Sequence, residues 1–301
     1  MANMSLSGWL GPRLAAKPVV ELFPGWVLGS GQRAGSASQF RRELWPLLRQ
    51  PFAVSWLDNS KLFLYPGNET SRSVFVTGRY EPNEFFLLQR VIQPGMTFID
   101  AGANMGLYSI FAARRVGPRG KVLALEPSGR EFEILQKNVK LNSLTNVIVI
   151  RKALADRASD LDLSVAPLGK SGHNTLGAFG YDTPLDHRER VHAERLDDVV
   201  YSEGLGRVDV IKMDIEGAEM AALRGAVETL RQFKPVLLIE LSDRSLQHQG
   251  SGSGEVLAWL EQQGYRTFCF DPATGSPVAL KTRAHFDSEN IVAAAGDATP
   301  W

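Results

Sequence analysis

Residues 97–109 read TFIDAGANMGLYS, and this stretch decides the fold class. Its first five residues form the apolar run of a buried strand, and Gly102 and Gly106 then allow the backbone to turn sharply into a helix. A strand that enters a helix through a glycine turn is typical of a doubly wound α/β fold, in which ligands bind beyond the carboxyl ends of the strands. The turn is not a dinucleotide fingerprint, because G-x-G-x-x-G would need glycine at Asn104 and Leu107.

Strands and helices alternate on the C-terminal side of this stretch, which predicts a mostly parallel sheet covered on both faces. We expect strands at 121–126, 146–151, 208–214 and 235–241. We expect helices at 103–115, 128–142 with Ser128 as N-cap, and 216–233. Residues 265–270 and 289–295 are predicted to close the sheet as an antiparallel pair. The fold class is therefore α/β and Rossmann-like, with seven strands.

The chain before this core divides into two further zones. Residues 1–50 are predicted to be a partly ordered arm, because 29–39 (GSGQRAGSASQ) resemble a linker while Trp9, Trp26 and Trp45 are expected to dock on the core. In residues 51–95, a hairpin that turns at Asp58-Asn59 and a third strand at 73–78 precede a helix over 81–92. The core then runs over 96–301, with an irregular insertion at 156–196 on the substrate side.

Composition excludes several classes of function. The chain of 301 residues carries 33 Lys+Arg and 33 Asp+Glu, so no basic surface dominates and nucleic acid is not the expected partner. The single cysteine, Cys269, allows neither an internal disulfide nor a cysteine-based zinc site. There is no apolar run of membrane-spanning length, and the only candidate for an N-terminal signal is interrupted by Lys17, Pro18, Glu21 and Pro24. We therefore expect a cytoplasmic protein that does not bind membranes.

Glu126 is predicted to end the second strand of the core, in VLALEPS. A carboxylate at this place can accept both ribose hydroxyls of a nucleoside ligand. By itself it would be read as a solvated cap, but it follows a G-x-N-x-G turn at the expected distance. Asp100, in that turn, suits a ligand with a cationic amino-acid portion better than a pyrophosphate. The glycine turn and Glu126 together predict a nucleoside cofactor other than a dinucleotide.

At this point the sequence resembles the FkbM family of S-adenosylmethionine-dependent, class I methyltransferases. The resemblance runs from about residue 60 to 295 and is carried by YEPNEF, DAGANMGLYS, EPSGREFEILQKNVKLN, ERLDDVV, VIKMDIEGAE and PVLLIEL. It implies S-adenosyl-L-methionine as the cofactor, with Glu126 on the ribose and Asp156 near the adenine. It also implies that the methionine part is lined by Asp100, Gly102, Asn104 and Gly106.

A second group of acidic residues, Asp214, Glu216 and Glu219, lies where the predicted strand 208–214 meets its helix. Carboxylates at a helix N-terminus also stabilise the helix dipole and cap amides, and Glu219 fits that structural role equally well. Asp214 is expected beside the glycine turn, where it could orient a substrate hydroxyl, accept its proton or hold the cofactor's amino group. A metal site at Asp214 and Glu216 is a further interpretation, but no histidine lies nearby, and we expect no metal.

Two residues are candidates for the general base that a hydroxyl acceptor needs. His173 lies in the glycine-rich segment GKSGHNTLG of the insertion, over the predicted mouth of the sheet. Glu240 ends the fifth strand of the core and is a comparable candidate. We therefore expect the catalytic group to come from Asp214, His173 and Glu240, although a histidine in a polar loop commonly has no such role.

These observations predict methyl transfer to a hydroxyl oxygen of a sugar, polyketide or other secondary-metabolite acceptor, the acceptor class being implied by the resemblance. The alternative within the class is N-methylation of a peptide or small molecule. DIEG stands at 214–217 where base-amino methyltransferases of nucleic acids carry an N-P-P-Y-type motif. A nicotinamide dehydrogenase is disfavoured by the broken fingerprint, whereas a binding module without turnover stays open. The partner is thus a small-molecule or peptide acceptor, and a homodimer is compatible with the sequence.

Overall fold

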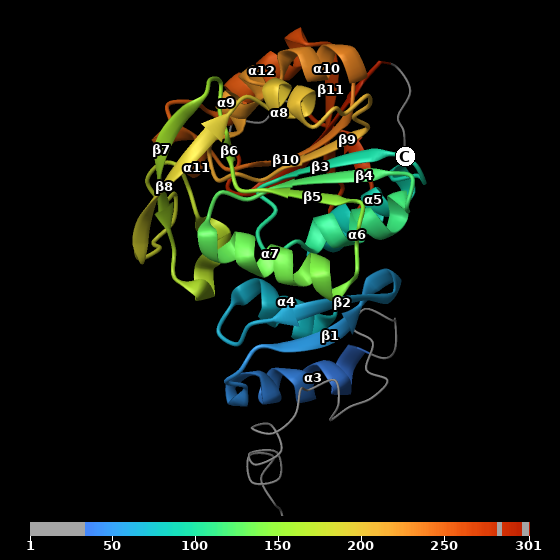
Figure 1. The fold of residues 1–301 in the computed structure, drawn as a ribbon, viewed down its shortest axis with the longest axis vertical. Helices are drawn as coiled ribbons and strands as arrows, with labels where there is room; N and C mark the ends of the chain where they lie inside the picture. Colours follow the sequence, from blue (N-terminus) through green and yellow to red (C-terminus); the bar gives the residue numbers. More distant parts are fainter. Residues whose placement is uncertain (1–33, 282–284, 297–300) are drawn as a thin grey trace, which may run out of the picture.

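The computed structural model describes residues 34–281, 285–296 and 301, and its centre is an eight-stranded sheet (Figure 1). The strand order is β12-β11-β13-β10-β9-β3-β4-β5. The parallel strands are β3 (Thr97–Ala101), β4 (Lys121–Leu125), β5 (Val147–Ile150), β9 (Val210–Met213) and β10 (Val236–Leu241). The antiparallel end consists of β11 (Tyr265–Phe270), β12 (Pro277–Ala279) and β13 (Glu289–Ala295).

The predicted α/β class and the antiparallel closure are confirmed, and the number of strands differs by one. The additional strand, β12, pairs with β11 at the edge of the sheet. Its three residues, PVA, are too short to give a readable alternation in the sequence.

Alternate residues of each central strand face opposite layers of helices. In β3, Phe98 packs in the core with α5 and α6, and Ile99 packs in the core with α9 and α12. Figure 1 shows α5 (Pro82–Val91), α6 (Leu107–Val116) and α7 (Gly129–Leu141) on one face of the sheet. On the other face lie α8 (Leu196–Ser202), α9 (Glu219–Arg224), α10 (Val227–Phe233) and α12 (Ser253–Gln262), with α11 (Asp243–His248) at the end of the layer. Both faces are therefore buried, as the continuous apolar runs predicted.

The hairpin before the core forms as predicted, but the third strand does not. β1 (Phe52–Trp56) and β2 (Ser60–Leu64) pair through a turn in which Asp58 and Asn59 have φ of 51° and 57°. The residues expected as a strand at 73–78 belong to a helix, α4 (Glu69–Thr77). The side chain of Asn68 caps this helix by accepting the backbone N–H of Ser71 over 2.7 Å, and Gly78 ends it in the left-handed conformation. The cap and the burial of Val74, Phe75 and Val76 on this helix outweigh the strand preference of SVFVT.

Asn138 of α7 and Asn142, the C-cap residue of that helix, attach the hairpin to the core. The side-chain oxygen of Asn142 accepts the backbone N–H of Lys61 over 2.7 Å, and its amide donates to the carbonyl of the same residue. Asn138 accepts the backbone N–H of Phe63 in the same way. The edge of β2 is thereby hydrogen-bonded to a helix rather than left open.

The arm contains a helix, α3 (Ala34–Leu44), so the linker interpretation of 29–39 is wrong where it overlaps this helix. Trp45 follows it, is buried and packs against Phe52 and Phe75, which confirms docking for this tryptophan. Trp9 and Trp26 lie outside the described residues.

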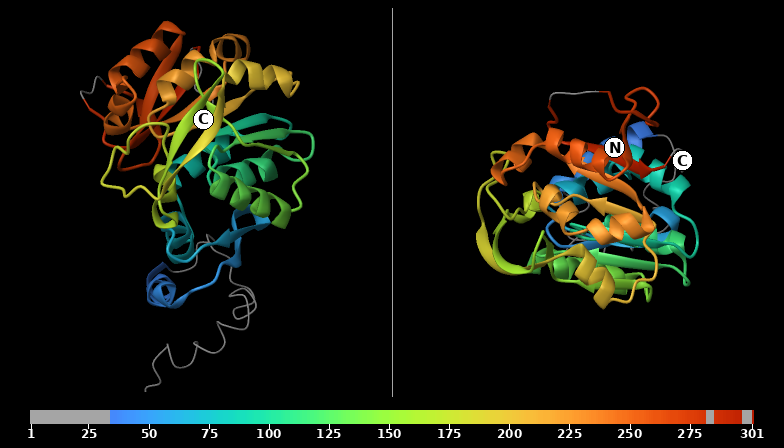
Figure 2. Two further views of the ribbon diagram at one scale, coloured as in Figure 1. Left: turned by 60° about the vertical axis from the view of Figure 1, so that its left-hand side comes forward. Right: turned by 90° about the horizontal axis from the view of Figure 1, so that it is seen from above.

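The insertion contributes a second, three-stranded sheet of β6 (Ala153–Leu154), β7 (Ser159–Val165) and β8 (His187–Glu194). Figure 2 shows its two long strands standing across the end of the central sheet. The connection between β7 and β8 includes a 3-10 segment, Leu168–His173, which carries a candidate base.

Two further expectations need correction. The helix expected over 216–233 is divided into α9 and α10 at Gly225, where a Cβ atom would lie 2.1 Å from the carbonyl oxygen of Ala155. Ser128 is the N-cap residue of α7, but its side chain donates to Glu131 instead of accepting a backbone N–H. Across the described part of the chain, the helices are too short or too polar for any of them to cross a bilayer.

Candidate active site

The site lies where the strand order of the sheet reverses. From β3 the chain continues outward through β4 and β5, and β9 returns on the other side of β3 before β10 follows. The loops after β3 and β9 therefore separate, which leaves a crevice at the carboxyl ends of the strands.

Gly102 fixes the distance between these two loops. It has φ of 77°, and a Cβ atom at this position would lie 1.9 Å from the carbonyl oxygen of Asp214. A residue other than glycine would be strained by the conformation and would clash with the neighbouring loop.

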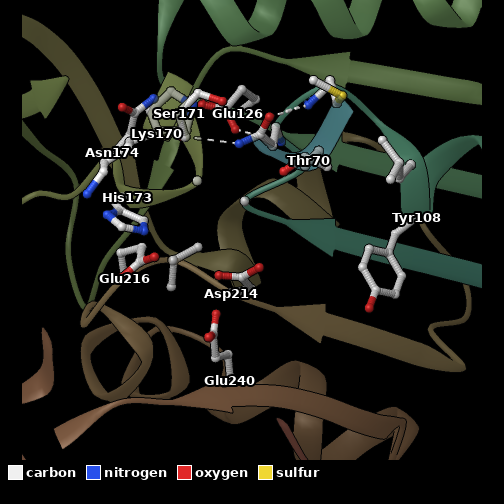
Figure 3. Close-up of a pocket in the computed structure, with 18 of the residues that line it drawn as sticks. Thr70, Tyr108, Glu126, Lys170, Ser171, His173, Asn174, Asp214, Glu216 and Glu240 are labelled. Atoms are coloured by element: carbon white, nitrogen blue, oxygen red, sulfur yellow. Dashed lines mark hydrogen bonds between the residues drawn. The ribbon is translucent and has the colours of Figure 1, made fainter. Parts of the chain in front are cut away.

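A cavity of about 550 Å³ opens at this crevice (Figure 3), a volume typical of small-molecule sites. Its walls come from several separate parts of the chain. These are the segment from α4 to the residue before α5, the loops after β3, β4 and β5, the insertion, and the loops after β9 and β10. The residues that bind a ligand here must therefore converge from distant parts of the sequence.

Glu126 lines the cavity at the end of β4 and is buried. One carboxylate oxygen accepts the backbone N–H of Asn104 over 2.8 Å, and the other accepts the backbone N–H of Ser128 over 2.9 Å. Burial raises its pKa to about 8, although these two hydrogen bonds act in the opposite direction. Each oxygen accepts a single backbone N–H, so the carboxylate keeps capacity to accept two ligand hydroxyls.

Lys212 lies under the floor of the cavity, in the middle of an otherwise apolar strand. Its Nζ is 3.0 Å from Asp214, 4.0 Å from Asp100 and 3.3 Å from the carbonyl oxygen of Gly102. Burial disfavours its charge, but the carboxylates of Asp214, Asp100 and Glu81 more than compensate and raise its pKa. The lysine thus stays charged and connects the two loops at the crevice.

Three carboxyl groups converge beyond β9 and β10, because an oxygen of Asp214, Glu216 and Glu240 each lies within 4.8 Å of the others. Burial raises the pKa of Glu216 to about 8 and that of Glu240 well above its usual value, and in both the charge of Asp214 adds to the shift. Burial also acts to raise the pKa of Asp214, but the Lys212 ammonium lowers it overall. Asp214 therefore carries the negative charge, and Glu240 holds a proton.

Such a group of carboxylate oxygens has the donor type that Mg²⁺ or Ca²⁺ prefers. In this cluster, however, Lys212 already compensates Asp214, and Ser245 and Ser288 donate to Glu216 and Glu240. These contacts compensate part of the charge of the cluster, and the absence of a metal ion stays a prediction.

His173 faces this acidic cluster from the insertion (Figure 3). Its Nδ1 lies 2.6 Å from the hydroxyl of Thr183, and its ring is 5.3 Å from that of Tyr181. Burial, assisted by Lys170, lowers its pKa below the ordinary value of 6.5, so the imidazole is neutral at pH 7. In the tautomer in which Nδ1–H donates to Thr183, the Nε2 lone pair is available in the cavity.

Most of the residues singled out in the sequence meet in this cavity. Its lining includes Gly102, Asn104, Glu126, His173, Asp214 and Glu240. Glu219 instead accepts the backbone N–H groups of Ile215 and Gly217, so it stabilises the loop after β9.

Three expected cofactor residues do not reach the cavity wall. Asp100 is fully buried below it, where it accepts a hydrogen bond from Ser109 and approaches Lys212. Gly106 begins α6, with φ of 89°, behind the wall. Asp156 is exposed and pairs with Arg157 at 3.7 Å, and Lys152 and Leu154 line the cavity on that side. The sequence predicted the right loops. After β3 and after β5, however, some of the predicted residues are only close in the chain to residues that line the cavity.

Sequence reasoning missed Glu81, Tyr108 and Lys212, which also line the cavity. A lysine inside the apolar run VDVIKMD is a readable signal, because an unpaired lysine is too costly to bury in a strand. Glu81 had a weaker signal in YEPNEF, whose position before the core does not reveal that it returns to the site.

Comparison with known proteins decides which ligand this geometry serves. The profile described as Methyltransferase FkbM domain matches residues 100–267, which is more than half of the chain. The chain belongs to the FkbM methyltransferase family. Its cofactor is S-adenosylmethionine.

Among individual relatives of this FkbM family member, Methyltransferase sdnD from Sordaria araneosa is 31% identical over 156 residues, covering 43% of this chain and 60% of sdnD. Hexuronic acid methyltransferase AglP from Haloferax volcanii is 24% identical over 139 residues, 46% of this chain and 53% of AglP. 2-O-methyltransferase NoeI from Sinorhizobium fredii is 26% identical over 195 residues, 57% of this chain and 76% of NoeI. The chain thus spans less than two thirds of the length of sdnD.

The residues of the cavity fit the cofactor. The free acceptor capacity of Glu126 suits the two ribose hydroxyls, and the neighbouring wall contains Leu125, Leu154 and Leu163, which suit an adenine ring. The loop after β3, with Gly102 and Asn104, lines the stretch between Glu126 and Asp214.

Proposed function

We propose that this chain transfers the methyl group of S-adenosylmethionine to a hydroxyl oxygen of a sugar, polyketide or other secondary-metabolite acceptor. One observation carries the proposal. Neutral His173 and the proton-sharing carboxyls of Asp214 and Glu240 line one end of the cavity, and Glu126 lines the other end. The names of NoeI, a 2-O-methyltransferase, and AglP, a hexuronic acid methyltransferase, support an oxygen on a sugar-like acceptor.

His173 is the general base in this proposal. The cofactor supplies a methyl group bound to a sulfonium sulfur. As the acceptor oxygen bonds to that methyl carbon, the carbon–sulfur bond would break and its electron pair would stay on sulfur, so that S-adenosylhomocysteine leaves as a neutral thioether. The proton of the acceptor oxygen would move to Nε2 of His173, whose Nδ1 is hydrogen-bonded to Thr183. The charge on Asp214 stabilises the imidazolium that results.

Glu240 has a different part in the proposal. Because it is protonated beside Asp214, it can donate a hydrogen bond to a second polar group of the acceptor and thereby orient the reacting hydroxyl. Its own proton makes it a weaker candidate for the base than His173.

N-methylation of a peptide or small molecule is the second candidate. The specific observation that favours it is the acidic cluster of Asp214, Glu216 and Glu240, which would attract a cationic amine. An amine acceptor would have to lose a proton before its nitrogen could attack, and His173 would serve in the same role.

Variants at His173 test the proposal once an acceptor is found by screening hydroxylated and amino compounds with radiolabelled S-adenosylmethionine. We expect His173→Ala to lower kcat by about 100- to 10,000-fold and to leave the Kd of S-adenosylhomocysteine within about twofold. His248→Ala is the matched control, because this histidine ends α11 and does not line the cavity.

An unchanged kcat for His173→Ala would reject the histidine as base and point to Asp214 or Glu240. Absence of turnover with every acceptor, together with tight S-adenosylhomocysteine binding, would favour a binding module. The exclusion of nucleic acid, the homodimer and the cytoplasmic location stay predictions.

A further inference from the structure

A half-buried acidic side chain from outside the matched family region lines the cavity. Glu81 lies directly before α5, 19 positions ahead of the first residue that the family profile matches. Its backbone has φ of 40° and ψ of 67°, a left-handed conformation that a side chain with a Cβ atom rarely adopts. The following proline, Pro82, occupies the first turn of the helix. Such strain commonly persists where a side chain has to be held at a functional site.

The contacts of Glu81 tie it to the cofactor half of the cavity. Its carboxylate accepts a hydrogen bond from the hydroxyl of Tyr108, in the first turn of α6 directly after the glycine turn. The ring of Tyr108 is held on both sides, since Phe85 stacks on it with centroids 4.6 Å apart and Lys212 Nζ lies 5.0 Å from its centroid. Glu81 is therefore held by residues that belong to the floor of the site.

When Glu81 is ionised, the charges of this wall are unbalanced. Lys212 forms its ion pair with Asp214 at 3.0 Å, and within the described residues no cationic group lies within 4.0 Å of the Glu81 carboxylate. Tyr108 provides one neutral hydrogen bond and no charge. A cation brought by a ligand would complete this part of the wall, and Asp214 is less suited to it because its charge is already paired.

We propose that Glu81 binds the α-ammonium group of the methionine part of S-adenosylmethionine, with Tyr108 positioning the carboxylate. The inference rests on the proposed function and adds a residue from the segment before the core to the cofactor site. Along the cavity, Glu126 contacts the ribose, the loop after β3 follows the linking chain, and Glu81 receives the charged amino end. It differs from the expectation that Asp100 or Asp214 would hold the amino group.

The test compares two ligands in two variants by calorimetric titration. S-adenosylhomocysteine carries the amino-acid part, and 5′-methylthioadenosine has the same adenine, ribose and thioether without it. We expect Glu81→Gln to weaken S-adenosylhomocysteine binding by about 10- to 100-fold and to change 5′-methylthioadenosine binding less than twofold. Tyr108→Phe should give the same selectivity with a smaller loss.

Glu84→Gln is the matched control. Glu84 is a buried carboxyl on the same helix that accepts a hydrogen bond from Asn290 at 3.2 Å and does not line the cavity. It should leave the affinity for both ligands unchanged. Thermal unfolding of all variants checks that they are folded, and deaminated S-adenosylhomocysteine, which carries hydrogen in place of the amino group, should lose affinity for the wild type but not for Glu81→Gln.

Equal losses for both ligands in Glu81→Gln would show a structural role and overturn the inference. Unchanged affinities with a reduced kcat would place Glu81 on the acceptor side and also overturn it. A wild type that binds neither ligand would instead reject the proposed function itself, so the two failures are distinguishable.

Discussion

At position 102 the backbone needs glycine for two independent reasons. The left-handed φ of 77° strains any residue with a Cβ, and that Cβ would lie 1.9 Å from the carbonyl oxygen of Asp214. We expect Gly102→Ala to lower the free energy of unfolding by about 2–5 kcal/mol, measured by urea denaturation. Gly206→Ala should stay within about 0.5 kcal/mol, because no atom lies within 4 Å of its Cβ position and its φ is not positive.

Glu126 allows a prediction that separates it from Glu81. The carboxylate of Glu126 accepts the backbone N–H groups of Asn104 and Ser128 with its two oxygens, whereas a glutamine has only one acceptor oxygen. The amide NH2 of the glutamine would therefore point at one of these two N–H groups, which places two donors opposite each other. We expect Glu126→Gln to weaken S-adenosylhomocysteine and 5′-methylthioadenosine together, each by about 10- to 100-fold, because both contain the ribose. A loss confined to S-adenosylhomocysteine would contradict the assignment of Glu126 to the ribose.

At the scale of elements, the hairpin depends on α7. The side chain of Asn142 is hydrogen-bonded to the backbone N–H and carbonyl of Lys61, each over 2.7 Å. We expect Asn142→Ala to cost about 1–3 kcal/mol of unfolding free energy, because both backbone groups lose their partner. The measurement is urea unfolding, with exposed Lys140 on the same helix changed to alanine as the control.

The loops after β9 and β10 lead to a prediction about metal ions. Lys212 neutralises Asp214, and Glu240 is protonated, so we expect the carboxyl cluster to be stable without a divalent cation. We expect EDTA to leave both turnover and the melting temperature unchanged. A rise of the melting temperature with millimolar Mg²⁺ or Ca²⁺, lost in Glu216→Gln, would contradict this expectation.

Helices and strands could be predicted from the sequence where consecutive residues determine them. The strand of Phe98, the glycine turn and the helix that follows were readable because apolar period and backbone freedom are properties of consecutive residues. The helix α4 was misassigned because its cap, Asn68, and the burial of its apolar side chains outweigh the strand preference of the residues that follow. The need for glycine at the break between α9 and α10 was unreadable, since the atom that a Cβ atom at 225 would meet is the carbonyl oxygen of Ala155, 70 positions away.

The same distinction applies to the residues of the candidate site. Glu126 and Asp214 were found because each follows a strand whose carboxyl end has a fixed place in this fold. Asp156 does not line the cavity, whereas Lys152 and Leu154, a few residues before it, do. Glu81 was missed because a segment before the core reaches the site only through tertiary packing against Tyr108.

At the scale of the whole molecule, the charges balance but are unevenly distributed. The 33 acidic and 33 basic residues leave no net charge, yet buried carboxyls gather at one end of the central sheet. Burial raises the pKa of Glu81 and Glu219 to about 7 and that of Glu126 and Glu216 to about 8. The ligand-free molecule therefore stores several protons at its active-site end that the unfolded chain would release.

This distribution sets how stability depends on pH. The unfolded carboxyls have pKa values near 4.5, so between pH 4.5 and 8 the folded state binds more protons than the unfolded chain, and its stability falls as pH rises. His173 acts in the opposite sense only below its unfolded value of 6.5, because its pKa is lowered in the folded state. Between pH 6.5 and 8 the carboxyls act together with His187, whose pKa is raised by its hydrogen bonds to Glu189 and Asp186 and which changes stability in the same direction.

We expect the unfolding free energy of the ligand-free protein to be lower at pH 8 than at pH 6.5 by more than about 1 kcal/mol, measured by urea denaturation at constant ionic strength. Glu126→Gln should flatten this dependence, since the substituted side chain no longer releases a proton in the window. Glu133→Gln, an exposed change on the same side of the sheet, should leave the slope unaltered. A stability that rises from pH 6.5 to 8 would show that these carboxyls are ionised in the folded state, because only groups with lowered pKa values give that sign.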